Sequence, residues 1–212
     1  MIPQIVLQTA TPTSAISPYN PLVVALMLVA AGATLTALFL LREARGTHTP
    51  TDRKSFAWLF GLLGGIALLV SGEIFWANWA GFPASQYTEL FGVAQTLYAV
   101  VMLAAAFSLY HEIDERPFAW VTAVSGLVLF QGAHAILSFK LTLSPSISAV
   151  IWVSAGLLAV VILPASYTPR GSVARRYLLY LAVLFAVVLA ATSLGMGIEA
   201  HYSHIAEAMQ SS

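Results

Sequence analysis

Six apolar segments dominate the sequence and constrain its fold more than any other feature. They cover residues 21–41, 56–77, 88–110, 118–139, 146–167 and 177–199. Each has roughly the 20 residues that an α-helix needs to cross the hydrocarbon core of a bilayer. Charged residues make up only 8% of the chain, whereas soluble domains carry about 25%. We therefore expect an all-α integral membrane protein, a transmembrane bundle of six helices that forms one domain over residues 1–212.

Prolines mark several ends of the predicted helices. Asn20-Pro21 and Ser144-Pro145 place a capping residue directly before a proline, and Pro117 precedes the fourth segment in a similar way. A proline is well tolerated in the first turn of a helix. Pro164 lies within the fifth segment, where its ring is expected to kink or end the helix.

The basic residues predict the orientation in the membrane. Eight of the nine lie in the connections that follow the first, third and fifth segments: Arg42, Arg45, Arg53, Lys54, Arg116, Arg170, Arg175 and Arg176. Lys140 alone lies on the other side. Because cytoplasmic loops are enriched in Lys and Arg, we expect both termini to be extracytoplasmic, and the chain to be a multi-pass protein of the cell membrane.

Composition also excludes several classes of function. The net charge is zero and no basic patch is present, which argues against nucleic acid as a partner. The absence of cysteine excludes disulfides and iron–sulfur clusters held by thiolates. No nucleophile elbow, phosphate-binding glycine loop or HExxH motif occurs, so an enzymatic activity is left open without a candidate catalytic residue.

A second group of polar residues is predicted near the outer ends of the helices. The candidate ligands are Glu73, Glu89, His134, Glu199 and His201, with Asn78, Gln95 and Gln131 in support. At a rise of about 1.5 Å per residue, Glu73 lies about one turn below its helix end and His134 about 9 Å below Lys140. Ionisable groups so close to hydrocarbon are costly and often functional. We therefore expect Glu73 and His134 to converge in an outward-facing site.

The chemistry of this predicted site allows several ligands. Carboxylate and imidazole suit Zn, Fe or Cu(II), and they also suit a proton or a polar headgroup. In the alternative interpretation the carboxylates are solvated at the interface. His201 and His204 could hold one ion on a continuing helix, although the sequence favours a frayed tail there. Haem is not favoured, because only His134 lies within a predicted segment.

The segment from Gly81 to Gly92, GFPASQYTELFG, follows Gly72-Glu73 by about ten residues. It resembles the Pro…Tyr-x-x-x-Phe-Gly signature of a family of small archaeal and bacterial membrane proteins, domain of unknown function 981 (DUF981). The resemblance implies a polytopic membrane protein with a structured loop at this point, and it implies no activity.

Three functions follow from the sequence as hypotheses. The first is a small membrane subunit or binding protein whose Glu/His site holds a metal ion, a proton or a polar ligand. The others are a purely structural accessory subunit of a larger membrane complex and a small-solute permease or channel. The expected partners are the lipid bilayer and either other membrane subunits or further copies of the chain. The sequence has no ionisable residue at the middle of a predicted helix, which counts against a transporter.

Overall fold

The computed structural model of the protein describes residues 21–76, 88–142 and 144–210. These residues form α1 (Pro21–Arg45), α2 (Pro50–Trp76), a π-helical turn η1 (Thr88–Gly92), α4 (Val93–His111), α5 (Arg116–Phe139), α6 (Pro145–Tyr167) and α7 (Val173–Gln210). Six helices are long and apolar enough to span a membrane, with η1 and α4 together forming the third. The described residues contain no strand, so the predicted all-α fold is confirmed.

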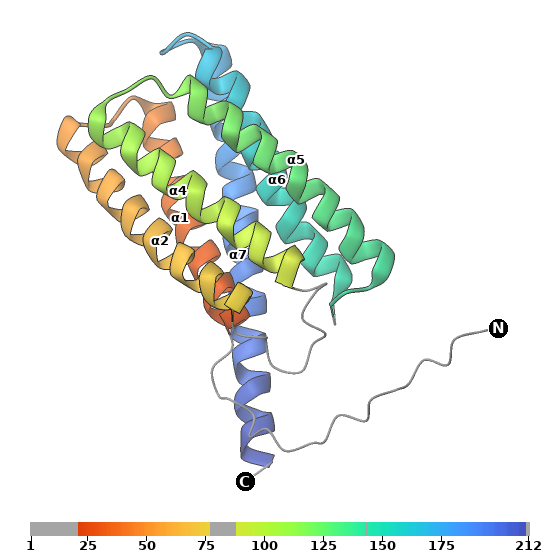
Figure 1. The fold of residues 1–212 in the computed structure, drawn as a ribbon. Coiled ribbons are helices and arrows are strands. Elements are labelled where there is room, and N and C mark those ends of the chain that lie inside the picture. The colour runs from red at the N-terminus through yellow and green to blue at the C-terminus, as the bar shows by residue number, and fades with distance from the viewer. Residues whose placement is uncertain (1–20, 77–87, 143, 211–212) are drawn as a thin grey trace.

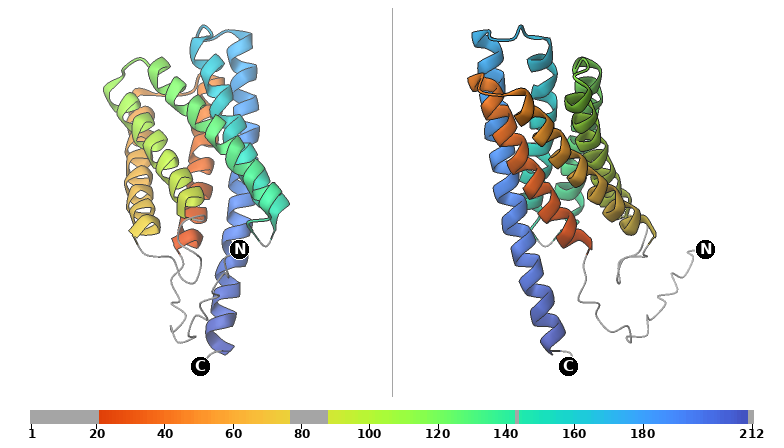
Figure 2. Two further views of the ribbon diagram at one scale, coloured as in Figure 1. Left: turned by 45° about the vertical axis from the view of Figure 1, so that its right-hand side comes forward. Right: turned by 90° about the vertical axis from the view of Figure 1, so that its left-hand side faces the viewer.

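The six helices form a ring in chain order (Figures 1 and 2). Each helix packs against the next one, and α7 closes the ring by packing along α1. The contacts are most extensive between α1 and α7, α5 and α6, and α2 and α4. They are much sparser between α1 and α2 and between α4 and α5. The α2–α4 hairpin is therefore the most loosely attached part of the ring.

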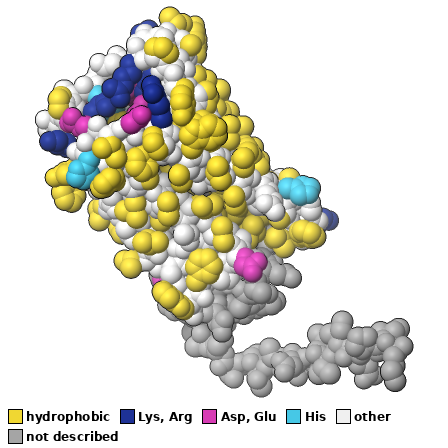
Figure 3. Space-filling model, turned by 45° about the horizontal axis from the view of Figure 1, so that its top comes forward, with side chains coloured by type: hydrophobic (Ala, Val, Ile, Leu, Met, Phe, Trp, Pro, Cys, Tyr) yellow, Lys and Arg dark blue, Asp and Glu magenta, His cyan; other side chains and the backbone are white. Residues whose placement is uncertain are grey.

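The surface of the ring suits a bilayer. Large apolar side chains are exposed on the outside of the helices, among them Leu62, Leu69, Leu127 and Leu184. Charged side chains gather at one end instead (Figure 3). We call this the basic end. It comprises the connections 46–49, 112–115 and 168–172 with the adjoining helix ends.

Local geometry explains where several helices end. Glu112 and Lys140 adopt left-handed conformations and cap α4 and α5, and their backbone N–H groups donate to Ser108 and Ile136 carbonyls. The helix α6 ends at Tyr167, within one turn of Pro164, as expected. The carbonyl of Pro164 accepts hydrogen bonds from both the N–H and the hydroxyl of Thr168.

The last helix differs from the expectation. A frayed tail after residue 199 was predicted, but α7 continues to Gln210 and is 38 residues long. Residues 198–210 contain Ala, Glu, Met and Gln and neither Gly nor Pro, so nothing local stops the helix. Its C-terminal part extends past the ends of the other helices (Figures 1 and 2).

Small residues allow α5 and α6 to pack backbone against backbone. A Cβ atom added at Gly126 would lie 2.8 Å from the carbonyl oxygen of Gly156 and 2.9 Å from the Cβ of Ala159. A Cβ at Gly156 would lie 2.7 Å from Cε1 of Phe130. Glycine is thus required at both positions for the close approach of the α5 and α6 backbones. Such close packing stabilises contacts between helices in a membrane, where the hydrophobic effect does not drive their association.

The Gly126→Val substitution is expected to destabilise the protein by about 1–3 kcal/mol, because the added methyl groups overpack the α5–α6 contact. The matched control is Gly195→Val on α7, where an added Cβ meets nothing within 4 Å. Thermal unfolding in detergent measures both. Equal melting temperatures for the two variants would contradict the assigned α5–α6 contact.

Candidate functional site

The residues of the predicted outer site lie on separate elements. Glu73 is partly buried on α2, Glu89 is exposed on η1, and His134 is exposed on α5. Glu199 and His201 are both exposed on α7. Of the remaining residues, Gln131 is exposed on α5, whereas Asn78 and the side chain of His204 lie outside what the structure describes.

The packing does not place Glu73 and His134 on neighbouring helices. The main neighbours of α2 are α4 and α1, whereas α5 packs mainly on α6. The Nε2 atom of His134 lies 3.5 Å from the hydroxyl of Ser138 on its own helix. Among the described residues, no three His, Asp or Glu side chains lie close enough to hold a metal ion. Metal binding is therefore unsupported, and convergence of Glu73 with His134 stays a prediction.

A cavity of about 340 Å³ lies inside the ring of helices. All six helices contribute to its walls, which are lined mainly by Leu, Ala, Val, Ile, Phe and Met side chains. It extends from Leu22 near the start of α1 to Glu43 near its end. These residues are separated by roughly 30 Å along the helix axis, which is also about the thickness of the hydrocarbon core.

Most hydroxyl groups that line the cavity already have partners. Thr36, Thr122 and Ser125 each donate to a carbonyl one turn earlier in the same helix. The hydroxyl of Tyr98 donates to the carbonyl of Leu28 at 2.8 Å and so joins α4 to α1. The cavity is therefore even less polar than its residue types suggest.

Gln95 differs from these residues. Its side chain is 4% exposed and lines the cavity, and its Nε2 atom has no hydrogen-bond partner among the described residues. A buried donor without a partner costs about 1–3 kcal/mol. The sequence assigned Gln95 a supporting role in an outer site, whereas the structure places it at the interior cavity, where it can donate to a bound molecule.

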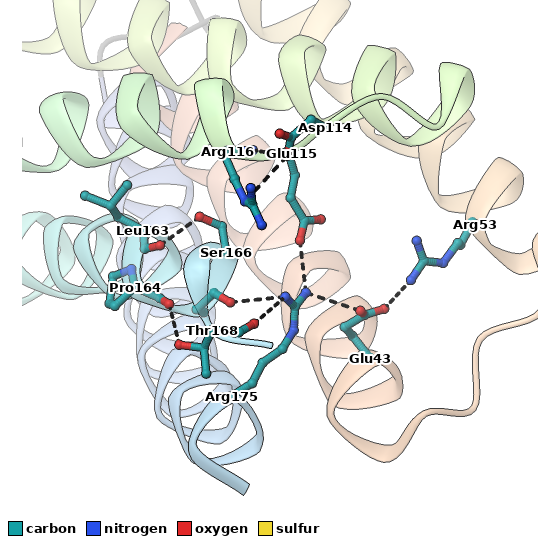
Figure 4. Close-up of polar contacts among 11 residues, drawn as sticks. Glu43, Arg53, Asp114, Glu115, Arg116, Leu163, Pro164, Ser166, Thr168 and Arg175 are labelled. Atoms are coloured by element: carbon teal, nitrogen blue, oxygen red, sulfur yellow. Dashed lines mark hydrogen bonds and ion pairs between the residues drawn. The ribbon is translucent and has the colours of Figure 1, made fainter. Parts of the chain in front are cut away.

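Charged side chains line the cavity at the basic end, and Figure 4 shows their contacts. We call Glu43, Arg53, Glu115 and Arg175 the Arg175 cluster. The guanidinium of Arg175 donates to Glu115 at 3.0 Å and to Glu43 at 3.4 Å. Arg53 donates to the other carboxylate oxygen of Glu43 at 2.6 Å. Arg175 also donates to the carbonyls of Ala165 at 3.1 Å and Thr168 at 3.3 Å.

The Arg175 cluster joins distant parts of the chain. Its side chains come from α1, α2, α7 and the residue before α5, and the two carbonyls belong to the end of α6. The Arg175 side chain is only 8% exposed. A charge so buried is tolerated when it is paired and hydrogen-bonded, and the guanidinium of Arg175 has four acceptors.

This cluster is not evident from the sequence, because Arg175 and Glu43 are 132 positions apart. In the sequence Arg175 is only one basic residue among eight near the ends of apolar segments. A local signal did exist, since Glu43 is an acidic residue between Arg42 and Arg45 at the end of an apolar segment.

Comparison with known proteins gives a family and no function. The family model described as "Protein of unknown function (DUF981)" matches residues 18–207, which confirms the resemblance noted in the sequence. No curated protein matches the chain, and no solved structure matches it.

The Arg175→Met substitution is expected to destabilise the protein by about 1–3 kcal/mol, because the carboxylates of Glu43 and Glu115 and two backbone carbonyls lose their shared donor. Arg176→Gln is the control, because the adjacent Arg176 is exposed and makes no ion pair within the described part of the chain. Thermal unfolding in detergent measures both variants. A melting temperature of Arg175→Met equal to that of Arg176→Gln would show that the cluster is not structural.

Proposed function

The chain belongs to the DUF981 family, and we propose that it is a membrane protein that binds the apolar chain of an amphipathic molecule within its ring of helices. The cavity inside the ring carries this proposal, because it is walled by apolar side chains from all six helices. Burial of each CH₂ group there would contribute about 0.8 kcal/mol relative to water.

The dimensions of the cavity favour a long molecule over a compact one. The cavity runs along the helix axis over a length close to the thickness of the hydrocarbon core. Its volume lies within the range of about 300–1,000 Å³ that is typical of small-molecule sites. An alkyl, acyl or isoprenoid chain matches both properties.

Gln95 offers a specific polar contact to the ligand in the cavity. Because its Nε2 atom is a donor without a partner in the described residues, it suits an oxygen acceptor on the ligand, such as an ester or ketone carbonyl. An apolar pocket with a few well-placed polar groups is the usual form of a site that binds and orients a small molecule.

Entry from the bilayer fits the arrangement of the helices. The helices α4 and α5 both line the cavity, and the contacts between them are sparse. A lipid chain could therefore pass between them without crossing a charged surface. The bilayer would serve as the source of the ligand.

The orientation of the chain in the membrane is a separate proposal. We propose that the basic end faces the cytoplasm and that both termini face outward, on the basis of the positive-inside rule. The cell membrane as location, a larger membrane complex and an outward-facing Glu/His site stay predictions.

Ala155→Phe tests the proposed function, because Ala155 is a partly buried cavity-lining residue of α6. The added ring should displace about two CH₂ groups of a bound chain and lower its affinity about tenfold. Native mass spectrometry of the delipidated protein, titrated with diacylglycerol, measures the bound fraction.

The matched control for this experiment is Val153→Phe on the same helix. Val153 is 36% exposed and is not among the residues that line the cavity. Its variant should bind diacylglycerol as the unmodified protein does. Equal binding by all three proteins, or no binding at all, would refute the proposed function.

Labelling of single cysteines tests the orientation, since the chain has no cysteine of its own. Thr47→Cys lies in the connection at the basic end, and Ser203→Cys lies on the exposed C-terminal part of α7. With an impermeant maleimide on intact cells, only Ser203→Cys should react. Reaction of Thr47→Cys alone would reverse the orientation.

A further inference from the structure

A second pocket of about 270 Å³ lies at the basic end, next to the apolar cavity. The two share Glu43, Arg53, Arg175 and Leu179 in their walls. The lining of the second pocket contains five arginines and a single carboxylate: Arg45, Arg53, Arg170, Arg175 and Arg176 with Glu43. This pocket, which we call the arginine pocket, thus carries an excess of positive charge.

The only carboxylate that lines the arginine pocket does not neutralise it. Both Arg53 and Arg175 share Glu43. Arg45, Arg170 and Arg176 form no ion pair with any residue that the structure describes. These three guanidinium groups are available to an added anion.

Other groups at the arginine pocket also favour an anion. Ser172 lines the pocket directly before the N-terminus of α7, where backbone N–H groups and the helix dipole attract negative charge. His48 lines the pocket as well, and its Nε2 atom bonds to the carbonyl of Phe39 at 2.9 Å. The Nδ1 atom of His48 is buried without a partner in the described residues.

The number of guanidinium groups points to phosphate over carboxylate. One arginine can satisfy both oxygens of a carboxylate through its planar fork. Several arginines around one pocket match a group with three or four oxygens, and arginine is well suited to phosphate. Basic pockets between transmembrane helices on the cytoplasmic side are also known to bind anionic lipid headgroups.

We propose that the arginine pocket binds the phosphate group of an amphiphile whose apolar chain lies in the adjoining cavity. The inference rests on the proposed function for the chain, and it adds the chemical class of the headgroup. Arg45, Arg170 and Arg176 contact the phosphate oxygens. The Arg175 cluster lies at the boundary between headgroup and chain.

The test compares three probes on the detergent-solubilised protein by native mass spectrometry: phosphatidic acid, diacylglycerol with the same acyl chains, and glycerol 3-phosphate. Phosphatidic acid should bind at least about tenfold more tightly than diacylglycerol, because charge-assisted hydrogen bonds hold its phosphate. In the double variant R170Q/R176Q this preference should be lost, while binding of diacylglycerol is unchanged.

The control variant K54Q/R116Q removes the same amount of charge from the same end of the protein. Neither Lys54 nor Arg116 lines the arginine pocket or the cavity. Its preference for phosphatidic acid should stay within about twofold of the unmodified protein. An equal loss of preference in both variants would overturn the proposal, because attraction to the whole basic surface would then explain the binding.

The outcomes separate the two proposals. Equal affinity of the unmodified protein for phosphatidic acid and diacylglycerol would overturn the phosphate site and leave the chain-binding cavity standing. Binding of glycerol 3-phosphate alone, lost in R170Q/R176Q, would support the phosphate site with a soluble ligand and refute the chain-binding cavity. No binding of any probe would overturn both.

Discussion

The structure of the basic end depends on the hydrogen bonds and ion pairs of the Arg175 guanidinium group. One buried side chain on α7 meets carboxylates from α1 and from the start of α5 and two carbonyls from the end of α6. Because desolvation of a single charge in a protein interior costs several kcal/mol, these acceptors must stay in place together. The helix ends around the cavity are thereby held at fixed positions, although the helices themselves pack loosely at two contacts of the ring.

Arg175 also explains why an apolar cavity can lie beside a charged pocket. Contact between the apolar side chains of the cavity and water would be unfavourable. Unpaired charges facing the cavity would also be unfavourable, because a buried charge needs a partner. Glu43 accepts from Arg53 on one carboxylate oxygen and from Arg175 on the other. The paired charges form a boundary that presents unpaired arginines on one side and apolar residues on the other.

The sequence predicts the helices but not the contacts between them, for one physical reason. The position of each spanning helix follows from the length of a local apolar segment, because backbone N–H and C=O groups in lipid must form hydrogen bonds within the segment. The described residues contain six such helices. Contacts between helices depend on which face each one presents, and that depends on residues far apart in the chain. Gln95 was expected to support an outer site, whereas its side chain lines the cavity, and Arg175 was counted only as one of the basic residues. The predicted frayed tail after residue 199 was wrong, because the polar residues there are compatible with a helix that continues to Gln210.

The uneven packing around the ring has a mechanical consequence. The α2–α4 hairpin has the sparse contacts of the ring on both of its sides, to α1 and to α5. Polar contacts join it to α1 at both ends: the Arg53–Glu43 and Arg42–Asp52 ion pairs at the basic end, and the Tyr98–Leu28 hydrogen bond near the other end. Moving the hairpin as a rigid unit would break fewer contacts than moving any other helix pair. The hairpin is thus the wall of the cavity that is held least firmly, fastened to α1 by ion pairs at the basic end and by one tyrosine hydroxyl near the other end.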